Sequence, residues 1–274
     1  YDIVVTHNNI FRPAIAAISA AKSAGIPSVL VPHAHLDDDF YHFPDVHECA
    51  READLVLACP KAACEFYERI GVRNVKYHAP GIDIGEDFSI QDEDAFLAQF
   101  KVRTPFFLVL GRKAAAKGYR HVILEIEKLT KTQEVHLVLI GPDDDGFEVG
   151  STNVTYLGAQ PRNVVRGALR ACIALINMSE SESFGIVLLE AWLAGRGVIA
   201  NADCSAFRDI ATHEENALLV SPSGLGAAMR RLLTDRALSS QLGARGKSTI
   251  VKYDWEAICK DFVDQCAELC TARE

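Results

Sequence analysis

Short apolar runs alternate with longer amphipathic segments along most of this 274-residue chain. The apolar runs predict strands at 2–6, 27–31, 55–58, near 75, 106–110, 135–140, 154–157, 171–176, from 197 and at 218–220. The amphipathic segments predict helices at 13–24, 45–52, 61–70, 93–100, 118–131, 161–169, 186–193, 222–233, 236–252 and 255–270. Wholly apolar strands alternating with helices are typical of parallel sheets covered on both faces. The pattern therefore predicts an α/β fold.

The alternation is interrupted between 85 and 103, where acidic residues cluster around Glu86 and Asp92. We interpret this segment as a linker that contains one helical piece. It separates a domain at 1–84 from a domain at 104–252, and 253–274 forms a closing helix that crosses back to the first domain. The expected architecture is two Rossmann-like domains that face a cleft.

Composition excludes several classes of protein. Charged residues make up 24% of the chain and the formal net charge is −9, which argues against a nucleic-acid-binding face. No apolar run approaches the ~20 residues of a membrane span, although contact with a membrane surface stays open. The eight cysteines form no Cys-x2-Cys pair, so we expect reduced thiols in a cytoplasmic protein and no metal site. The run Asp37-Asp38-Asp39 is interpreted as a solvated turn.

The segment from Ser179 to Ala200 contains the first candidate site. An apolar strand precedes a polar loop, Gly185 opens a helix that begins at Ile186, and another strand follows. Ligands of parallel sheets bind at strand carboxyl ends and helix N-termini. Glu182 on the loop and Glu190 about one turn into the helix can therefore address one ligand from two sides. The alternative is a capping glutamate and a solvated one.

A second candidate site is the pattern Gly111-Arg112-x4-Lys117-Gly118 after the strand at 106–110. A glycine lets a ligand approach the backbone, and two cations near a helix start suit a diphosphate. Two solvated cations are the alternative. Gly141 ends the next strand and is followed by Pro142 and Asp143.

Histidines end strands of the first domain. His33 follows the strand at 27–31, where ligand groups are expected, and His35 competes for the same role. His7 also ends a strand. The alternative for His33 is a hydrogen bond to a neighbouring loop.

The glutamate pair, with Ser183-Phe184-Gly185 between its members, resembles the Glu-x7-Glu motif of the group 1 (family-4) retaining glycosyltransferases. The Gly111-to-Gly118 pattern, Pro80-Gly81-Ile82-Asp83 and Tyr156-Leu157-Gly158 match the same family. The sequence departs from it at Asp143, where the family often has glycine, at Ala217, where it usually has glycine, and at Gly197, where it usually has proline.

The resemblance implies a GT-B fold and transfer of a sugar, with retention of configuration, from a UDP- or GDP-sugar to an acceptor hydroxyl. Arg112 and Lys117 would hold the diphosphate, with Gly111, Gly141 and the backbone from Ser183 to Ile186 close to the nucleotide. Glu190 would bind the ribose, Glu182 the transferred sugar, and His33 would lie beside that sugar. The nucleotide-sugar is a substrate, so no cofactor is implied. The acceptor is a glycan, a lipid-linked or a small molecule.

Two other functions share this fold: a non-catalytic nucleotide- or partner-binding module, and a sugar-nucleotide epimerase. The resemblance also implies that the N-terminal domain is about half the family's length, so we expect a fragment of a longer chain. Its first strand or a neighbour would then present an open sheet edge through which copies could associate.

Overall fold

The chain folds into two units, and the structure, a computed structural model, describes residues 1–271. The first unit comprises residues 1–81, 181–184 and the chain from Tyr253 onward. The second comprises 82–180 and 185–252. Both contain parallel sheets flanked by helices, so the predicted α/β class is confirmed.

The sheet of the first unit has four parallel strands. Their spatial order follows the sequence: β1 (Val4–His7), β2 (Ser28–Val31), β3 (Leu55–Ala58) and β4 (Val75–Tyr77). The helices of this unit are α1 (Arg12–Ala24), α2 (Pro44–Glu52), α3 (Lys61–Arg69), α11 (Trp255–Thr271) and the 3-10 turn η1 (Asp39–His42).

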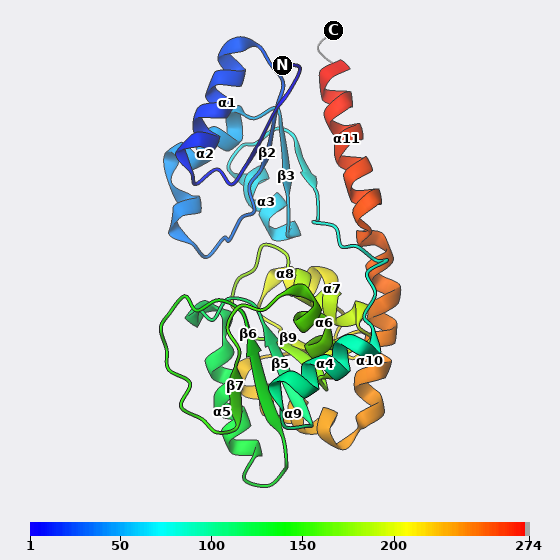
Figure 1. Cartoon of the computed structure of the whole chain (residues 1–274). Coiled ribbons are helices and arrows are strands. Elements are labelled where there is room, and N and C mark those ends of the chain that lie inside the picture. Colours follow the sequence, from blue (N-terminus) through cyan, green and yellow to red (C-terminus); the bar gives the residue numbers. More distant parts are fainter. Residues whose placement is uncertain (272–274) are drawn as a thin grey trace. The chain divides into compact units, whose positions relative to one another are not determined.

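Both faces of this sheet are covered. Leu30 and Val56 point toward the first three helices, where Ile18 and Phe66 belong to the same core. Alternate residues such as Val31 point to the opposite face, where the cluster includes side chains of α11. Figure 1 shows α11 running alongside this sheet. This two-sided burial explains why every residue of β2 and β3 is buried and why all of them except Ser28 are apolar. β1 and β4 form the sheet's edges, and association through β1 stays a prediction.

The second unit contains a six-stranded parallel sheet. Its spatial order is β10 (Leu218–Val220), β9 (Gly197–Asn201), β8 (Ala174–Asn177), β5 (Phe106–Leu110), β6 (His136–Ile140) and β7 (Val154–Tyr156). The chain winds outward from β5 to β7 and then returns to β8 on the other side of β5. The strand order therefore reverses between β5 and β8, the topological switch point where open α/β sheets bind ligands.

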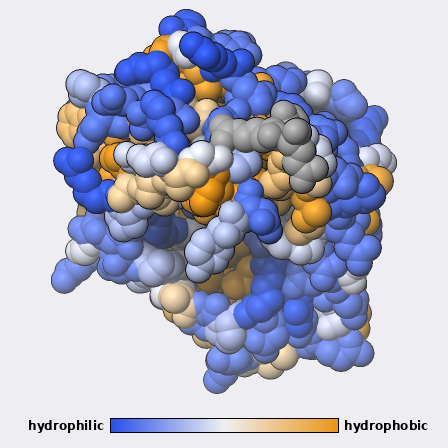
Figure 2. All heavy atoms as spheres, turned by 90° about the horizontal axis from the view of Figure 1, so that it is seen from above, coloured by the Kyte–Doolittle hydropathy of each residue, from blue (hydrophilic) through white to orange (hydrophobic). Residues whose placement is uncertain are grey.

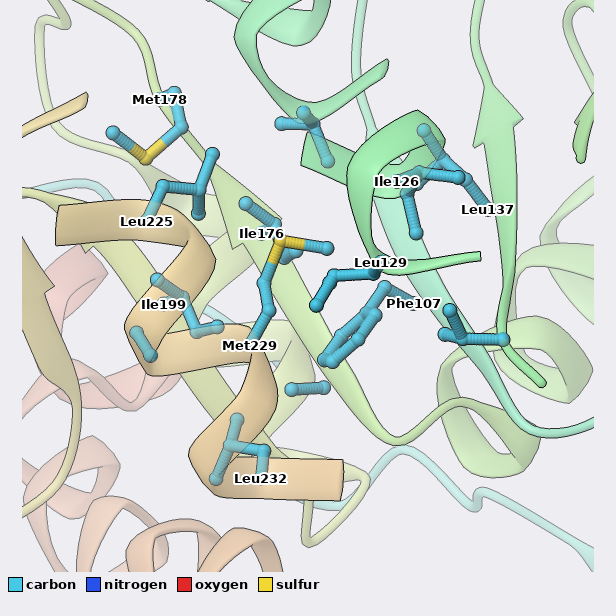
Figure 3. Packing of buried hydrophobic residues seen from close by; sticks show 14 of the residues in the cluster. Phe107, Ile126, Leu129, Leu137, Ile176, Met178, Ile199, Leu225, Met229 and Leu232 are labelled. Atoms are coloured by element: carbon cyan, nitrogen blue, oxygen red, sulfur yellow. The ribbon is translucent and has the colours of Figure 1, made fainter. Parts of the chain in front are cut away.

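Helices cover both faces of this larger sheet. They are α4 (Ile90–Phe100), α5 (Tyr119–Leu129), α6 (Arg162–Ala171), α7 (Ile186–Leu193), α8 (Ser205–Ile210), α9 (Leu225–Thr234) and α10 (Arg236–Thr249), with 3-10 turns η2 (Ala115–Lys117), η3 (Pro222–Gly224) and η4 (Ile250–Tyr253). In Figure 3, side chains from α5 and α9 meet those of the strands in one apolar cluster.

The segment assigned to a linker, 85–103, belongs to the second unit. Its helix α4 packs on α6, and a Cβ added to Gly167 of α6 would lie 2.2 Å from the carbonyl oxygen of Asp92. Two ion pairs tie the same helices together, Arg166 with Asp92 at 2.8 Å and Arg170 with Glu93 at 2.8 Å. Asp92 and Glu93 of the acidic cluster are thus part of a helix–helix contact.

The surface seen in Figure 2 is largely hydrophilic, and its hydrophobic side chains form separate patches. Within residues 1–271, no helix combines the length and the apolar composition needed to cross a bilayer. None of the eight cysteines, all of which lie within residues 1–271, forms a disulfide.

Candidate functional site

The loops at the switch point of the second unit are packed together through glycine. A Cβ on Gly118 would lie 2.1 Å from the carbonyl oxygen of Met178, so the loop after β5 can contact the loop after β8 only with glycine there. The backbone N–H of Glu180 also donates to the carbonyl of Ala116, at 3.3 Å. The sequence therefore brings the two predicted ligand loops together at one edge of the sheet.

The predicted glycines Gly111 and Gly141 are in contact with each other. Gly141 has a φ of +149°, and a Cβ there would lie 1.8 Å from the carbonyl oxygen of Gly111. The backbone N–H of Gly111 donates to the carbonyl oxygen of Ile140 at 2.9 Å. The ends of β5 and β6 thus run close enough for a ligand to meet bare backbone from both loops.

Arg112 and Lys117 lie on the loop after β5, as expected, but Arg112 has a partner. Its Nη1 donates to Asp144 Oδ2 at 2.6 Å, and the Arg112 side chain is 59% exposed. Lys117 is half-buried at the end of η2. Arg112 is thus held by a surface carboxylate in this structure.

Lys113, which the sequence analysis did not single out, is the buried cation of this loop. Only 3% of its side chain is exposed, and its Nζ donates to Asp145 Oδ1 and to the carbonyl of Phe147, both at 2.8 Å. Asp143 Oδ1 lies 2.7 Å from the same nitrogen. The hydrogen bond from Lys113 holds the pKa of Asp145 below its usual range. Lys113 therefore fixes the loop after β6, and Asp143 is one of the carboxylates of that loop that contact it.

The helix after β8 begins as predicted. Gly185, with a φ of +98°, is the N-cap of α7 and carries no side chain that could cap it. Ile186 is the first helical residue and is 39% exposed. N–H groups of a first helical turn favour an anion, so the start of α7 offers backbone donors for one.

Glu190 lies in α7, as predicted, and is paired with an arginine of α6. Its Oε1 accepts a hydrogen bond from Arg162 Nη1, and its side chain is 13% exposed. Burial raises the pKa of Glu190, although Arg162 acts in the opposite direction. One signal of this pair can be found in the sequence: Arg162 follows Pro161 at the start of a helix, where the dipole disfavours a cation.

The residues Glu182, Ser183 and Phe184 pack with the first unit. Phe184 is buried and its ring meets that of Tyr253 edge-on, with centroids 5.3 Å apart. Glu182 and Ser183 are half-exposed. The aromatic contact anchors the segment that carries the first glutamate of the motif.

His33 lies at a pocket of the first unit with a volume of about 340 Å³. Its Nε2 is 3.0 Å from Nδ1 of His7, and Tyr41 Oη donates to its backbone carbonyl at 3.0 Å. Partial burial lowers the pKa of His33, and the neighbouring His7 adds to this effect. His33 is therefore a neutral imidazole at pH 7, able to donate or accept one hydrogen bond. His35 is half-buried nearby in the chain.

The walls of this pocket are mostly apolar. They come from the strand ends and from one side of α11: Val31, Leu57, Trp255, Ile258, Phe262 and Val263. His78 joins the two histidines there. Neither here nor elsewhere in residues 1–271 does a group of three or more His, Cys, Asp or Glu side chains form a candidate metal site.

The two Rossmann-like units and the strand-end loops place the chain among α/β proteins of the GT-B type. It belongs to the family described as glycosyl transferases group 1, whose model matches residues 91–249.

Two relatives with known names are glycosyltransferases as well. The chain is 32% identical over 183 residues to the lipopolysaccharide core biosynthesis glycosyltransferase LpsD of Rhizobium meliloti, a match that covers 61% of this chain and 52% of that protein. It is 29% identical over 165 residues to a phosphatidyl-myo-inositol mannosyltransferase of Mycolicibacterium smegmatis, covering 55% and 42%. The chain thus spans about half the length of the curated relatives it matches.

Solved structures show the same fold. Anabaena HepE in complex with UDP-glucose matches with a TM-score of 0.84 at 20% identity, covering 98% of this chain and 79% of HepE. Sucrose-phosphate synthase from Thermosynechococcus elongatus matches with a TM-score of 0.81 at 20% identity, covering 99% and 74%.

Proposed function

We propose that this chain transfers a sugar from a nucleotide-sugar to an acceptor hydroxyl with retention of configuration. The observation that carries the proposal is the switch point of the second unit. There, bare glycine backbone, the cations Arg112 and Lys117, and the start of α7 lie on loops at one sheet edge. That set of groups suits the diphosphate of a nucleotide-sugar.

We assign roles by the chemistry of each group. Arg112 and Lys117 neutralise the leaving diphosphate, and the N–H groups at Gly185 and Ile186 add to this stabilisation. Glu190 accepts hydrogen bonds from the ribose diol, and Glu182 binds hydroxyls of the transferred sugar.

The donor is proposed to be a UDP- or GDP-sugar. Support for UDP comes from the similar fold of HepE, which was solved with UDP-glucose. The acceptor side is assigned to the first unit, where His33 meets the sugar and the apolar pocket receives an apolar part of the acceptor.

Binding of UDP, GDP and ADP, measured by calorimetry, tests the diphosphate assignment. Arg112→Ala and Lys117→Ala should each weaken binding by about 1.5–3 kcal/mol, the scale of a charge-assisted hydrogen bond. Arg103→Ala, a change of an exposed cation outside the loop, is the matched control. Unchanged affinity in both loop variants would remove the assignment.

Turnover of UDP- and GDP-sugars then separates the functions. A transferase releases the nucleotide only when an acceptor is present, and the product keeps the anomeric configuration of the donor. An epimerase would invert a sugar carbon without net release, and a binding module would do neither.

A further inference from the structure

Arg162 occupies an unusual position, because its planar guanidinium serves two carboxylates at once. Nε donates to Glu86 Oε1 at 2.7 Å and Nη2 donates to Glu86 Oε2. The remaining nitrogen, Nη1, donates to Glu190 Oε1. Because two nitrogens of the guanidinium bind one carboxylate, the third nitrogen points in a fixed direction.

The position of Arg162 is fixed by a second layer of charges. Arg166, one turn further along α6, donates from Nε to Asp92 Oδ2 at 2.8 Å and from Nη1 to Glu86 Oε1 at 3.3 Å. Glu86 is therefore held by both arginines, and hydrogen bonding to Arg162 lowers its pKa. Because α4 and α6 are joined here, the guanidinium of Arg162 has little freedom to move.

The hydrogen bond to Glu190 uses one carboxylate oxygen only. Within residues 1–271, Oε2 of Glu190 makes no hydrogen bond or ion pair with another residue. A carboxylate offers about four acceptor positions, so this one retains capacity for hydroxyl groups. The charged groups that act on Glu190 are Arg162, which favours the ionised form, and Glu86, which opposes it.

We propose that Arg162 is a positioning residue for the donor's ribose, which holds Glu190 by Oε1 and leaves Oε2 to accept hydrogen bonds from the ribose hydroxyls. The inference rests on the proposed function, which assigns Glu190 to the ribose. It accounts for a cation at the first residue of α6, where the helix dipole opposes it. Lysine cannot replace it, because an ammonium lacks the rigid fork that grips Glu86 while reaching Glu190.

The ratio of the protein's affinity for a ribonucleotide to its affinity for the 2′-deoxy form tests this role directly. The probes are UDP, GDP and ADP, each compared with its 2′-deoxy form by calorimetry, on wild-type protein, Arg162→Met, Arg162→Lys and Arg166→Met. Arg166 is the matched control, since it belongs to the same ion-pair cluster and does not contact Glu190. Thermal melting shows that each variant is folded.

Wild-type protein should bind the ribonucleotide about tenfold or more tightly than its 2′-deoxy form, as expected for a hydrogen bond to a charged group. Both Arg162 variants should reduce that preference to about threefold or less, while Arg166→Met keeps it. Should Arg162→Met be unfolded, Arg162→Lys, which retains the charge, decides the matter.

Three results would overturn the proposal: an unchanged preference in a folded Arg162 variant, an equal loss in Arg166→Met, or no preference in wild-type protein. In each of these cases the proposed nucleotide binding would stand. If wild-type protein binds none of the nucleotides, the proposed function fails and this inference fails with it.

Discussion

Gly167→Ala tests the contact that positions α6. Gly167 lies inside the helix, where alanine is favoured over glycine by up to about 1 kcal/mol. The new Cβ would lie 2.2 Å from the carbonyl oxygen of Asp92 and 2.7 Å from the Cβ of Phe96. Ordinary contact begins near 3.4 Å, so the helices must separate by about 1 Å.

Such a separation cannot be absorbed by a side chain, because the obstacle is backbone. Overpacking of this kind costs roughly 1–3 kcal/mol, and it also strains the Arg166–Asp92 ion pair. Because the helix-propensity gain of up to about 1 kcal/mol offsets part of this cost, we expect Gly167→Ala to destabilise the chain by up to about 2 kcal/mol. Each kcal/mol that is lost should lower the midpoint of thermal unfolding by about 2–4 °C.

Gly226→Ala is the matched control for this prediction. Gly226 is also inside a helix, α9, and its added Cβ would also lie 2.2 Å from another atom. That atom is Oε2 of Glu125, the flexible end of a side chain, which can rotate away. Gly226→Ala should therefore stay within about 1 kcal/mol of wild type in urea unfolding. If the two variants are equally stable, the close helix contact at Gly167 is not as described.

Three further changes follow from the described contacts. Asp144→Asn should strengthen nucleoside diphosphate binding by up to about fivefold, because it frees Arg112 from a surface ion pair worth about 0–1 kcal/mol; weaker binding in calorimetry would contradict this. Trp192→Phe should lower stability by about 1–3 kcal/mol in urea unfolding, because Trp192 Nε1 donates to the carbonyl of Asn216 at 2.8 Å in the core. Burial lowers the pKa of His136 in the folded chain below its ordinary value of 6.5. The unfolded chain therefore takes up the proton first, and the free energy of unfolding should fall as the pH drops below about 6.5. His136→Gln should flatten that loss between pH 7 and 5, and a slope equal to wild type would contradict the assignment.

Much of the fold follows from the local sequence pattern. Strands such as β3 and β5 are found at the predicted residues, because a short apolar run between polar turns has few other stable forms. The strand predicted at 171–176 begins later, at Ala174, because α6 continues to Ala171. The short helix α8 was missed, since its six residues give too little periodicity to recognise.

The partners of the site residues could not be predicted in the same way. Glu86 and Arg162 are far apart in the sequence, and only the packing of α4 on α6 brings them together. The burial of Lys113 depends likewise on the acidic run around Asp145, on the loop after another strand. A local motif indicates which residues can bind a ligand, but the tertiary fold determines which of them already have a partner.

The two ion pairs at the candidate site differ in what a ligand can do to them. Arg112 and Asp144 are exposed by 59% and 35%, so a diphosphate can replace Asp144 at a cost of about 0–1 kcal/mol. Glu190 is 13% exposed, and removing Arg162 would leave an unpaired, largely buried carboxylate, a change that costs about 3–5 kcal/mol when the charge is fully buried. The diphosphate of a nucleotide would therefore replace Asp144 as the partner of Arg112, whereas its ribose would bind Glu190 without displacing Arg162. Under the proposed function, the diphosphate side would open for each new donor, while the ribose side would already be arranged before the donor binds.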